Sequence, residues 1–161
     1  MRVVVTGATG NVGTSVVAAL AADERVSEIV GIARRIPTWT APKTRFLSLD
    51  VATDEITPHL LDVDAVVHLA WLFQPTHRPL VTWHTNTLGS IRVFQAACAA
   101  GVGALVHASS IGVYSPGPAD GRAVDESWPT HSLPTAAYGR EKAYTERVLD
   151  TLECKFPGTR I

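Results

Sequence analysis

Short runs of apolar residues alternate with longer helical patterns over most of the chain. Residues 3–5 are three consecutive valines that end at Thr6-Gly7, as expected of a parallel strand covered on both faces. An Ala- and Val-rich stretch of good helix formers follows, and the next apolar run is again short. The pattern predicts strands at 3–5, 28–32, 45–49, 64–69 and 104–108, and helices at 12–22, 54–61, 79–100 and 137–152. This β/α alternation predicts an α/β fold with a doubly wound parallel sheet.

The segment 114–135 interrupts this alternation. It contains four prolines and two glycines, which predicts a long surface loop and not a linker between two domains. The last helix should stop at Phe156-Pro157-Gly158, and the residues 159–161 resemble the opening of another strand. We therefore expect one domain over residues 1–161.

Composition agrees with one globular domain, because 46% of the 161 residues are hydrophobic and 18% are charged, which excludes disordered and collagenous classes. Fourteen Lys and Arg balance fifteen Asp and Glu, so no large field favours nucleic acid or a membrane surface as partner. Cys98 and Cys154 form no metal-ligand pattern, so no metal site is expected. The N-terminal sequence lacks a signal-peptide core, which makes a cytoplasmic location the default expectation.

A glycine pattern lies directly after the first predicted strand and opens the first predicted helix. It comprises Gly7, Ala8, Thr9, Gly10, Asn11, Val12 and Gly13. Gly7 allows a tight turn, Gly10 allows the backbone to approach a pyrophosphate, and Gly13 allows the helix to pack on the strand. Three glycines alone also occur in ordinary strand-to-helix turns, but the strand before and the helix after are what a dinucleotide site requires.

The end of the second predicted strand should decide which nucleotide is bound. A carboxylate there would bind the ribose 2′-hydroxyl of NAD, whereas this chain has Arg34 and Arg35, which can pair with the 2′-phosphate of NADP. NADP is therefore favoured over NAD, and an exposed basic turn remains the alternative. After the third strand, Asp50 could accept from the adenine amino group while Val51 covers the ring, or Asp50 could cap the next helix.

Ser110, Tyr138 and Lys142 form the candidate catalytic set. Tyr138 and Lys142 are four residues apart on a predicted helix, and Ser110 follows the fifth strand at the edge where α/β sheets bind ligands. A free phenol has a pKa of about 10, so a neighbouring ammonium is needed to make it a useful base. Each residue taken singly is ordinary on a surface helix or in a turn.

Together these segments resemble the N-terminal part of an extended short-chain dehydrogenase/reductase, the NAD(P)-dependent epimerase/dehydratase family with its NAD(P)-binding Rossmann fold. The resemblance is carried, in the family's order, by 6–13, Asp50-Val51, His68-Leu69-Ala70, 86–90, 109–114 and 138–142. It implies that Ser110 orients the substrate oxygen, Tyr138 is the acid/base, and Lys142 holds the nicotinamide ribose and lowers the phenol pKa. It further implies that Asn86 supports the site and that His68, Leu69 and Ala70 lie beside the cofactor.

Two departures from the family qualify the resemblance. Members are longer and have a C-terminal substrate-binding portion, so we expect this chain to be a fragment, a truncated gene product or part of something larger, with little activity alone. Dehydratases of the family carry an acidic pair after the active-site hydroxyl, where this chain has Ile111-Gly112. Dehydration is therefore disfavoured.

Three features keep two interpretations. The apolar segment 71–83 is either a substrate wall or a helix start packed on the core, with Trp71 an ordinary hydrophobe. His68 is more typical of a hydrogen-bonded histidine near the core than of an acid/base. His131 lies in the long loop before Tyr138, and this position alone suggests that it touches substrate.

We expect an oxidoreductase that moves a hydride between NADP and a secondary alcohol or ketone, or a sugar-nucleotide epimerase using the same residues. A dinucleotide-binding or redox-sensing module without turnover is the alternative. The expected partner is a small-molecule substrate, with a homodimer left open.

Overall fold

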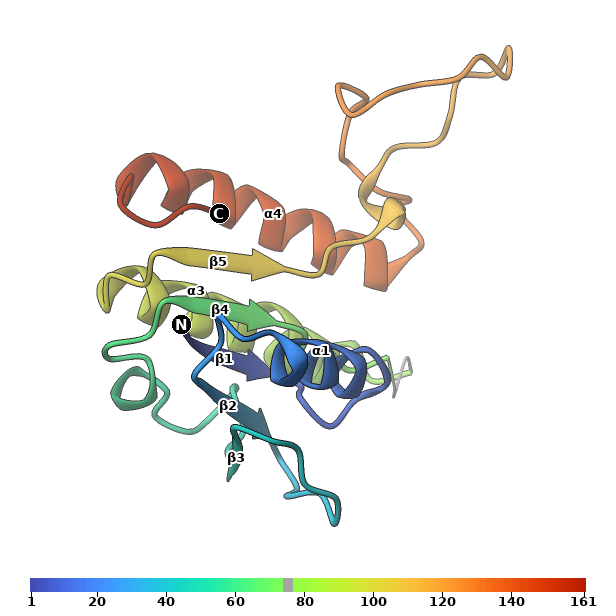
Figure 1. The fold of residues 1–161 in the computed structure, drawn as a ribbon. Coiled ribbons are helices and arrows are strands. Elements are labelled where there is room, and N and C mark those ends of the chain that lie inside the picture. The colour runs from blue at the N-terminus through green and yellow to red at the C-terminus, as the bar shows by residue number, and fades with distance from the viewer. Residues whose placement is uncertain (74–76) are drawn as a thin grey trace.

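The computed structural model describes residues 1–73 and 77–161. Five parallel strands form one sheet in the order β3-β2-β1-β4-β5 (Figure 1). The strands are β1 (Arg2–Thr6), β2 (Glu28–Ala33), β3 (Thr44–Ser48), β4 (Ala65–His68) and β5 (Ala104–His107). All five predicted strands are confirmed within two residues at either end. The order reverses at β1, because the chain builds outward to β3 and then returns to β4, which leaves a crevice at the carboxyl ends of β1 and β4.

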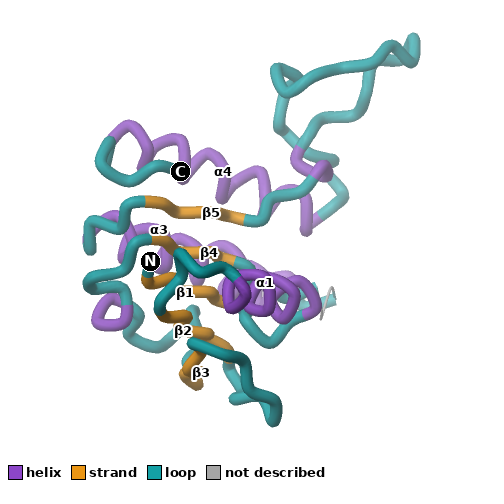
Figure 2. Tube along the Cα trace, viewed as in Figure 1, coloured by secondary structure: helices purple, strands orange, loops and turns teal. Residues whose placement is uncertain are grey.

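Helices pack on both faces of this sheet, which confirms the doubly wound α/β architecture (Figure 2). They are α1 (Asn11–Ala22), α2 (Pro79–Thr82), a π-helical segment η2 (Trp83–Leu88), α3 (Gly89–Ala99) and α4 (Ala137–Lys155), with short 3₁₀ turns η1 (Thr57–His59) and η3 (Ile111–Val113). None of the helices in the described residues is long and apolar enough to cross a membrane.

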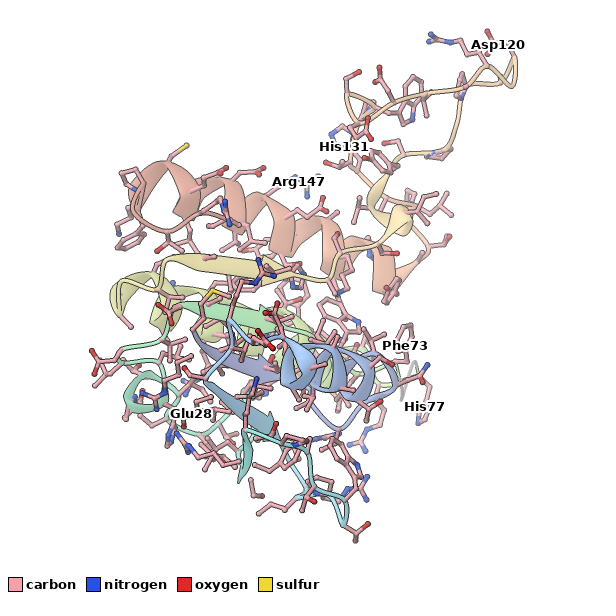
Figure 3. The ribbon with its side chains drawn as sticks, viewed as in Figure 1. Glu28, Phe73, His77, Asp120, His131 and Arg147 are labelled. Carbon is pink, nitrogen blue, oxygen red and sulfur yellow. The ribbon has the colours of Figure 1, made fainter. Side chains whose placement is uncertain are left out.

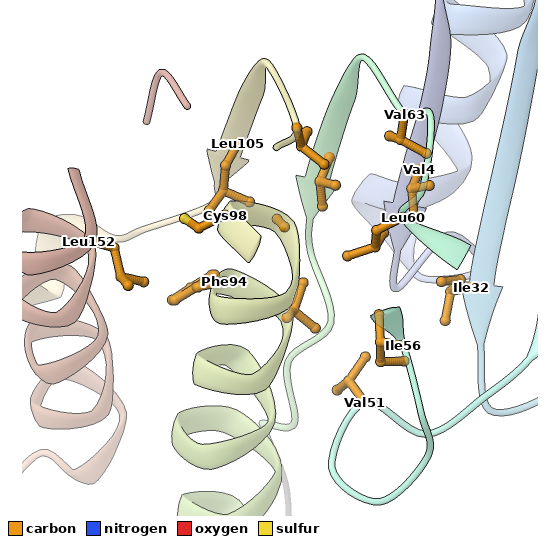
Figure 4. Packing of buried hydrophobic residues seen from close by; sticks show 14 of the residues in the cluster. Val4, Ile32, Val51, Ile56, Leu60, Val63, Phe94, Cys98, Leu105 and Leu152 are labelled. Carbon is orange, nitrogen blue, oxygen red and sulfur yellow. The ribbon is translucent and has the colours of Figure 1, made fainter. Parts of the chain in front are cut away.

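Alternate residues of β1 enter two separate cores. Val3 and Val5 pack with Val17 of α1 on one face, whereas Val4 belongs to the larger cluster with Phe94 of α3 and Leu152 of α4 on the other (Figure 4). A strand buried on both faces needs an unbroken apolar run, and this is why residues 3–5 are all valine.

The predicted helix at 54–61 is wrong, because only the three-residue turn η1 forms there. The Asp54 carboxylate accepts from the Asp50 amide at 2.8 Å, and the Asp50 carboxylate accepts from the Ala52 amide at 2.9 Å. These local side-chain bonds compete with a helix, and Pro58 confines the remaining turn.

The helix predicted at 79–100 forms as three consecutive helical pieces, α2, η2 and α3. The π-helical middle piece, which sequence periodicity does not reveal, contains Asn86, and such segments are frequent at functional sites. The last helix, α4, runs to Lys155 and is thus three residues longer than expected. Beyond it, Arg160 makes an isolated parallel bridge with Ala104 of β5, as the strand-like ending suggested.

The segment between η3 and α4 is the long loop that the prolines and glycines predicted. It projects away from the sheet, with Asp120 at its outer end and His131 near its return to α4 (Figure 3). Its base is fixed by hydrogen bonds from the Ser115 amide to the Pro129 carbonyl (2.7 Å) and from the Ser132 amide to the Val113 carbonyl (2.8 Å). The loop thus begins and ends beside η3, next to the candidate catalytic residues.

Candidate active site

The three glycines after β1 meet three different surroundings. Gly7 has a positive φ of 71°, and a Cβ there would lie 2.7 Å from the Ala70 amide nitrogen. A Cβ on Gly13 would clash with the Gly7 carbonyl oxygen. A Cβ on Gly10 would meet only that same carbonyl oxygen, at 3.2 Å, among described atoms within 4 Å. Gly7 and Gly13 are therefore required by packing, while Gly10 leaves the backbone open on its outer side.

The open side of Gly10 coincides with the start of α1. Gly10 is the N-cap and has no side-chain cap hydrogen bond, and α1 begins at Asn11. The amides of Asn11, Val12 and Gly13 therefore lack acceptors within the helix, and the helix dipole adds partial positive charge there. This arrangement suits a phosphate or pyrophosphate group.

A cleft of about 190 Å³ begins at this loop and crosses the carboxyl ends of the strands. Predicted cofactor-binding residues that line it are Gly7, Thr9, Gly10, Arg34, Asp50, Val51, Leu69 and Ala70. Two further lining residues, Trp71 and Leu72, belong to the segment 71–83, for which a substrate wall was one of the two interpretations. The remaining lining residues, Ile32, Ala33, Leu49 and Thr85, were not predicted. Ile32, Ala33 and Leu49 lie at the ends of β2 and β3, where the position of the backbone and not the type of side chain brings a residue to the cleft.

The structure separates the two arginines at the end of β2. Both are exposed, but Arg34 lines the cleft and Arg35 is not among its described lining residues. Asp50 lines the cleft, but it does not cap a helix, because none begins in the described residues directly after it; its carboxylate accepts from the Ala52 amide within a turn.

His68 lies fully buried beneath this cleft, with both ring nitrogens in hydrogen bonds. Nδ1 is 2.6 Å from Thr6 Oγ1, and Nε2 is 2.8 Å from Ser90 Oγ. Burial lowers its pKa well below the usual value, and the neighbouring His107 and Lys142 lower it further. His68 is therefore a neutral structural histidine, consistent with the interpretation favoured from the sequence.

Ser110 and Tyr138 both lie near Gly112. Ser110 Oγ accepts from the Gly112 amide at 3.1 Å and so caps η3. A Cβ on Gly112 would lie 3.4 Å from that oxygen and 3.9 Å from the Tyr138 ring. A Cβ on Gly139 would clash with the Gly112 carbonyl oxygen, so glycine at 139 allows α4 to press against η3. This close packing brings the Tyr138 ring beside the Ser110 turn.

Lys142 lies one helical turn after Tyr138 on α4, as predicted, and is 3% exposed. Its Nζ donates to the Ala108 carbonyl at 2.5 Å and lies 3.5 Å from the centroid of the Trp71 ring. Burial lowers the pKa of Lys142 to about 8, although the carboxylates of Glu146 and Glu141 act in the opposite direction. A pKa of about 8 leaves the amine largely cationic at neutral pH, and the Trp71 ring that it contacts also meets the Tyr138 ring.

An aromatic wall surrounds this end of the cleft. The Tyr138 ring stacks on Phe73 at 5.1 Å and meets Trp71 edge-on at 5.9 Å between ring centroids. Trp71 lines the cleft, whereas Phe73 is 68% exposed and is not among the described residues that line it. Residues 74–76 of the apolar segment lie outside the described part of the chain.

Asn86 and Glu141 form a buried polar cluster behind this wall. Asn86 Nδ2 donates to Glu141 Oε2 at 2.8 Å, and Thr82 Oγ1 donates to Glu141 Oε1 at 2.7 Å. Asn86 was expected to support the site, whereas no role was predicted for Glu141. By contrast, His131 is exposed on the long loop and is not among the described residues that line the cleft.

The described residues contain no group of three or more His, Cys, Asp and Glu side chains placed to hold a metal ion. Ser110, Tyr138 and Lys142 are not among the described residues that line the cleft, but Tyr138 and Lys142 adjoin it through their contacts with Trp71. The fold is a Rossmann-like, doubly wound α/β fold with a cleft at the carboxyl ends of its strands.

Comparison with known proteins agrees with this class. The chain belongs to the NAD dependent epimerase/dehydratase family, whose pattern matches residues 3–161.

Individual relatives differ in what they bind. The UDP-glucose 4-epimerase of Neisseria meningitidis serogroup B is 27% identical over 94% of this chain and 48% of its own length. The structure of MoeE5 in complex with UDP-glucuronic acid and NAD is 30% identical, with a TM-score of 0.78 over 94% of this chain and 49% of that one. A short-chain dehydrogenase/reductase superfamily protein from Agrobacterium tumefaciens with bound NAD is 29% identical, with a TM-score of 0.79 over 94% of this chain and 44% of that one.

The chain thus spans about half the length of the curated epimerase and of these solved structures. The shared half is the one that carries the glycine loop, the cleft and the Ser-Tyr-Lys set.

Proposed function

We propose that this chain binds NADP(H) and provides the reacting residues of an oxidoreductase or epimerase that acts on a secondary alcohol or ketone carbon. The observation that carries the proposal is that Tyr138 and Lys142 both contact Trp71, which lines the same cleft as Gly10. The side of the cleft at Gly10 suits a pyrophosphate, and the side at Trp71 adjoins the Tyr138 ring and the Lys142 amine. We expect a nicotinamide dinucleotide to extend from one side to the other.

The fit of the dinucleotide rests on the backbone and on three side chains. The open Gly10 and the free amides of α1 would hold the pyrophosphate, and Asp50 and Val51 would border the adenine. Arg34 would pair with the 2′-phosphate, which favours NADP, although the related structures contain NAD. When bound, the nicotinamide supplies or accepts the hydride.

The three candidate catalytic side chains have different roles in the proposed reaction. In the oxidation direction, Tyr138 Oη takes the proton from the substrate hydroxyl while the substrate carbon that bears this hydroxyl loses a hydride. In the reduction direction, Tyr138 returns the proton to the substrate oxygen. The Ser110 hydroxyl donates a hydrogen bond to the substrate oxygen and so orients the reacting carbon. The Lys142 ammonium stabilises the phenolate and would bond the ribose hydroxyls after leaving the Ala108 carbonyl.

An epimerase would use the same residues, with the hydride returned to the opposite face of the carbon. Because relatives bind UDP-glucose or UDP-glucuronic acid, these compounds are the first substrates to test. Net consumption of NADPH with a ketone would identify a reductase, and isomerisation without added cofactor would identify an epimerase.

The deciding experiment titrates NADPH and NADH into the chain by calorimetry and then follows absorbance of the reduced nicotinamide after adding substrate. We expect saturable binding of NADPH and, with a productive substrate, hydride transfer that Tyr138→Phe removes. Binding without any transfer, unchanged by Tyr138→Phe or Ser110→Ala, would favour the non-catalytic module. Absence of binding to either dinucleotide would refute the proposal.

A further inference from the structure

Glu141 is a buried carboxylate that the proposed reaction does not use. It lies on α4 between Tyr138 and Lys142 and is only 4% exposed. Burial of a carboxylate is costly unless strong hydrogen bonds compensate for the lost water. Both of its oxygens are indeed bonded, Oε1 to the Thr82 hydroxyl of α2 and Oε2 to the Asn86 amide of η2.

Asn86 carries this contact on to a third segment of the chain. Its Oδ1 accepts from the Leu72 amide at 2.6 Å, and its Nδ2 donates to the Leu72 carbonyl at 2.9 Å. The second proton of Nδ2 goes to Glu141. Because turning the amide over would break both bonds to Leu72, the acceptor at Glu141 and the backbone at Leu72 favour the same orientation of Asn86.

Leu72 in turn connects the two aromatic residues of the cleft end. Trp71 precedes it and contacts the Lys142 ammonium, and Phe73 follows it and stacks on Tyr138. Fixing the Leu72 backbone therefore limits how far either ring can move from its partner on α4. A loop at the end of a strand has few other means of holding side chains in place.

We propose that Glu141 is a positioning residue that acts through Asn86 on the Leu72 backbone, and so holds Trp71 and Phe73 against Lys142 and Tyr138. Its significance for catalysis rests on the proposed function, but the coupling between Glu141 and Leu72 does not. Three elements distant in sequence, α4, the α2-η2 helix and the segment after β4, are thereby joined through one carboxylate.

The network makes a specific demand on the residue at position 141. An amide can replace the carboxylate, because its oxygen can accept from Asn86 while its nitrogen donates to Thr82 Oγ1, whose own proton then goes to the Pro79 carbonyl at 3.1 Å. Alanine satisfies neither partner and leaves Asn86 short of one acceptor. Glu141→Gln should therefore keep the coupling and Glu141→Ala should lose it.

Amide hydrogen exchange at Leu72 tests the proposal without a cofactor or a substrate. In Glu141→Ala we expect exchange of the Leu72 amide to accelerate by at least about tenfold, while the Val4 amide in the central strand keeps its protection. Glu141→Gln should stay within about threefold of the unmodified chain. Glu153→Ala, an exposed glutamate on the same helix, is the matched control and should change neither amide.

A double variant tests whether Glu141 acts through Asn86. On an Asn86→Ala background, Glu141→Ala should add little further exchange at Leu72, because the connecting amide is already absent. If Glu141→Ala alone does not fold, Thr82→Val decides the question, since it removes one donor from the carboxylate, leaves α4 unchanged and should also accelerate exchange at Leu72.

The outcomes separate this proposal from the proposed function. Faster exchange at Leu72 in Glu141→Ala or Thr82→Val, with recovery in Glu141→Gln, supports positioning even if the chain binds no dinucleotide. Unchanged exchange at Leu72 in folded variants overturns it, even if NADPH binds normally. Equal acceleration at Leu72 and Val4 also overturns it, because Glu141 would then contribute only to global stability. Where NADPH does bind, its affinity should fall in Glu141→Ala and recover in Glu141→Gln.

Discussion

The Lys142 ammonium lies against the face of the Trp71 ring, with Nζ 3.5 Å from the ring centroid. This contact joins the helix that carries Tyr138 to the segment that lines the dinucleotide cleft. A cation over an indole face is attracted by the ring quadrupole, which helps to keep a charge in a place with little water. The charge state of Lys142 should therefore affect both the stability of the fold and the binding of a cofactor.

We expect the free energy of unfolding to rise at alkaline pH because of Lys142. Its pKa is lowered to about 8 in the fold, chiefly by burial, against an ordinary value of 10.5. Between these values the unfolded chain binds more protons, so the free energy of unfolding should increase as pH rises through this window, by about 1–3 kcal/mol. Denaturant unfolding at pH 8 and pH 10 measures it, and Lys142→Met should remove this contribution whereas Lys155→Met, on the exposed end of α4, should not.

Binding should show the opposite pH dependence. Loss of the ammonium above about pH 8 removes the proposed ribose donor, so NADPH affinity should fall there in the unmodified chain. Lys142→Met should bind weakly at every pH. Calorimetric affinities that do not change between pH 7 and pH 9.5 would contradict the assigned role of Lys142.

We expect a substitution at Gly10 to affect dinucleotide binding and one at Gly13 to affect folding. In Gly10→Val the side chain would project into the open space proposed for the pyrophosphate, so binding should be lost while far-ultraviolet circular dichroism stays close to that of the unmodified chain. Gly13→Val should instead disrupt the fold, because its Cβ meets the Gly7 carbonyl oxygen. Equal loss of structure in both variants would argue that Gly10 is also needed for packing.

We expect Arg34, and not Arg35, to select NADPH over NADH. Arg34 lines the cleft, so Arg34→Ala should weaken NADPH binding by on the order of 1 kcal/mol, allowing for the exposure of this side chain, and should leave NADH binding nearly unchanged. Arg35→Ala is the matched control and should have little effect on either ligand. Equal affinities of the unmodified chain for NADPH and NADH would refute the proposed preference.

We expect a substitution at Tyr138 to change the rate of hydride transfer but not the affinity for NADPH. Tyr138→Phe keeps the ring that stacks on Phe73 but removes the transferable proton, so NADPH affinity should persist while hydride transfer falls by at least about a hundredfold. Single-turnover absorbance with a substrate that the unmodified protein accepts measures the rate. A rate within a few-fold of that protein would exclude Tyr138 as the acid/base.

We expect His107 to make the fold less stable in acid. Burial and the nearby Lys142 lower its pKa to about 3, while the ordinary value is 6.5. The unfolded chain therefore takes up a proton that the fold excludes, and the free energy of unfolding should decrease as pH falls from about 6.5 toward 3, by about 1–2 kcal/mol by pH 5. Between pH 7 and pH 5, the loss of unfolding free energy should be smaller in His107→Phe than in the unmodified chain. His131→Gln, on the exposed loop, should lose as much as the unmodified chain.

The sequence by itself determined the features that depend on near neighbours along the chain. Runs such as residues 3–5 located the strands, because a strand buried on both faces must be continuously apolar. The glycine loop was readable because tight turns and open backbone restrict residue type at fixed spacing. For the same reason the four-residue spacing of Tyr138 and Lys142 placed them together on α4, as the structure confirms.

Only the tertiary structure decided which groups from distant segments meet. Arg34 and Arg35 are equivalent in sequence, but the direction of the chain after β2 brings only Arg34 to the cleft. The contact of Trp71 with Lys142, and the bonds that join Glu141 to Leu72 through Asn86, connect elements brought together by the order of the strands. Such contacts depend on packing across the sheet and between helices, which leaves no periodic signal in the residues that make them.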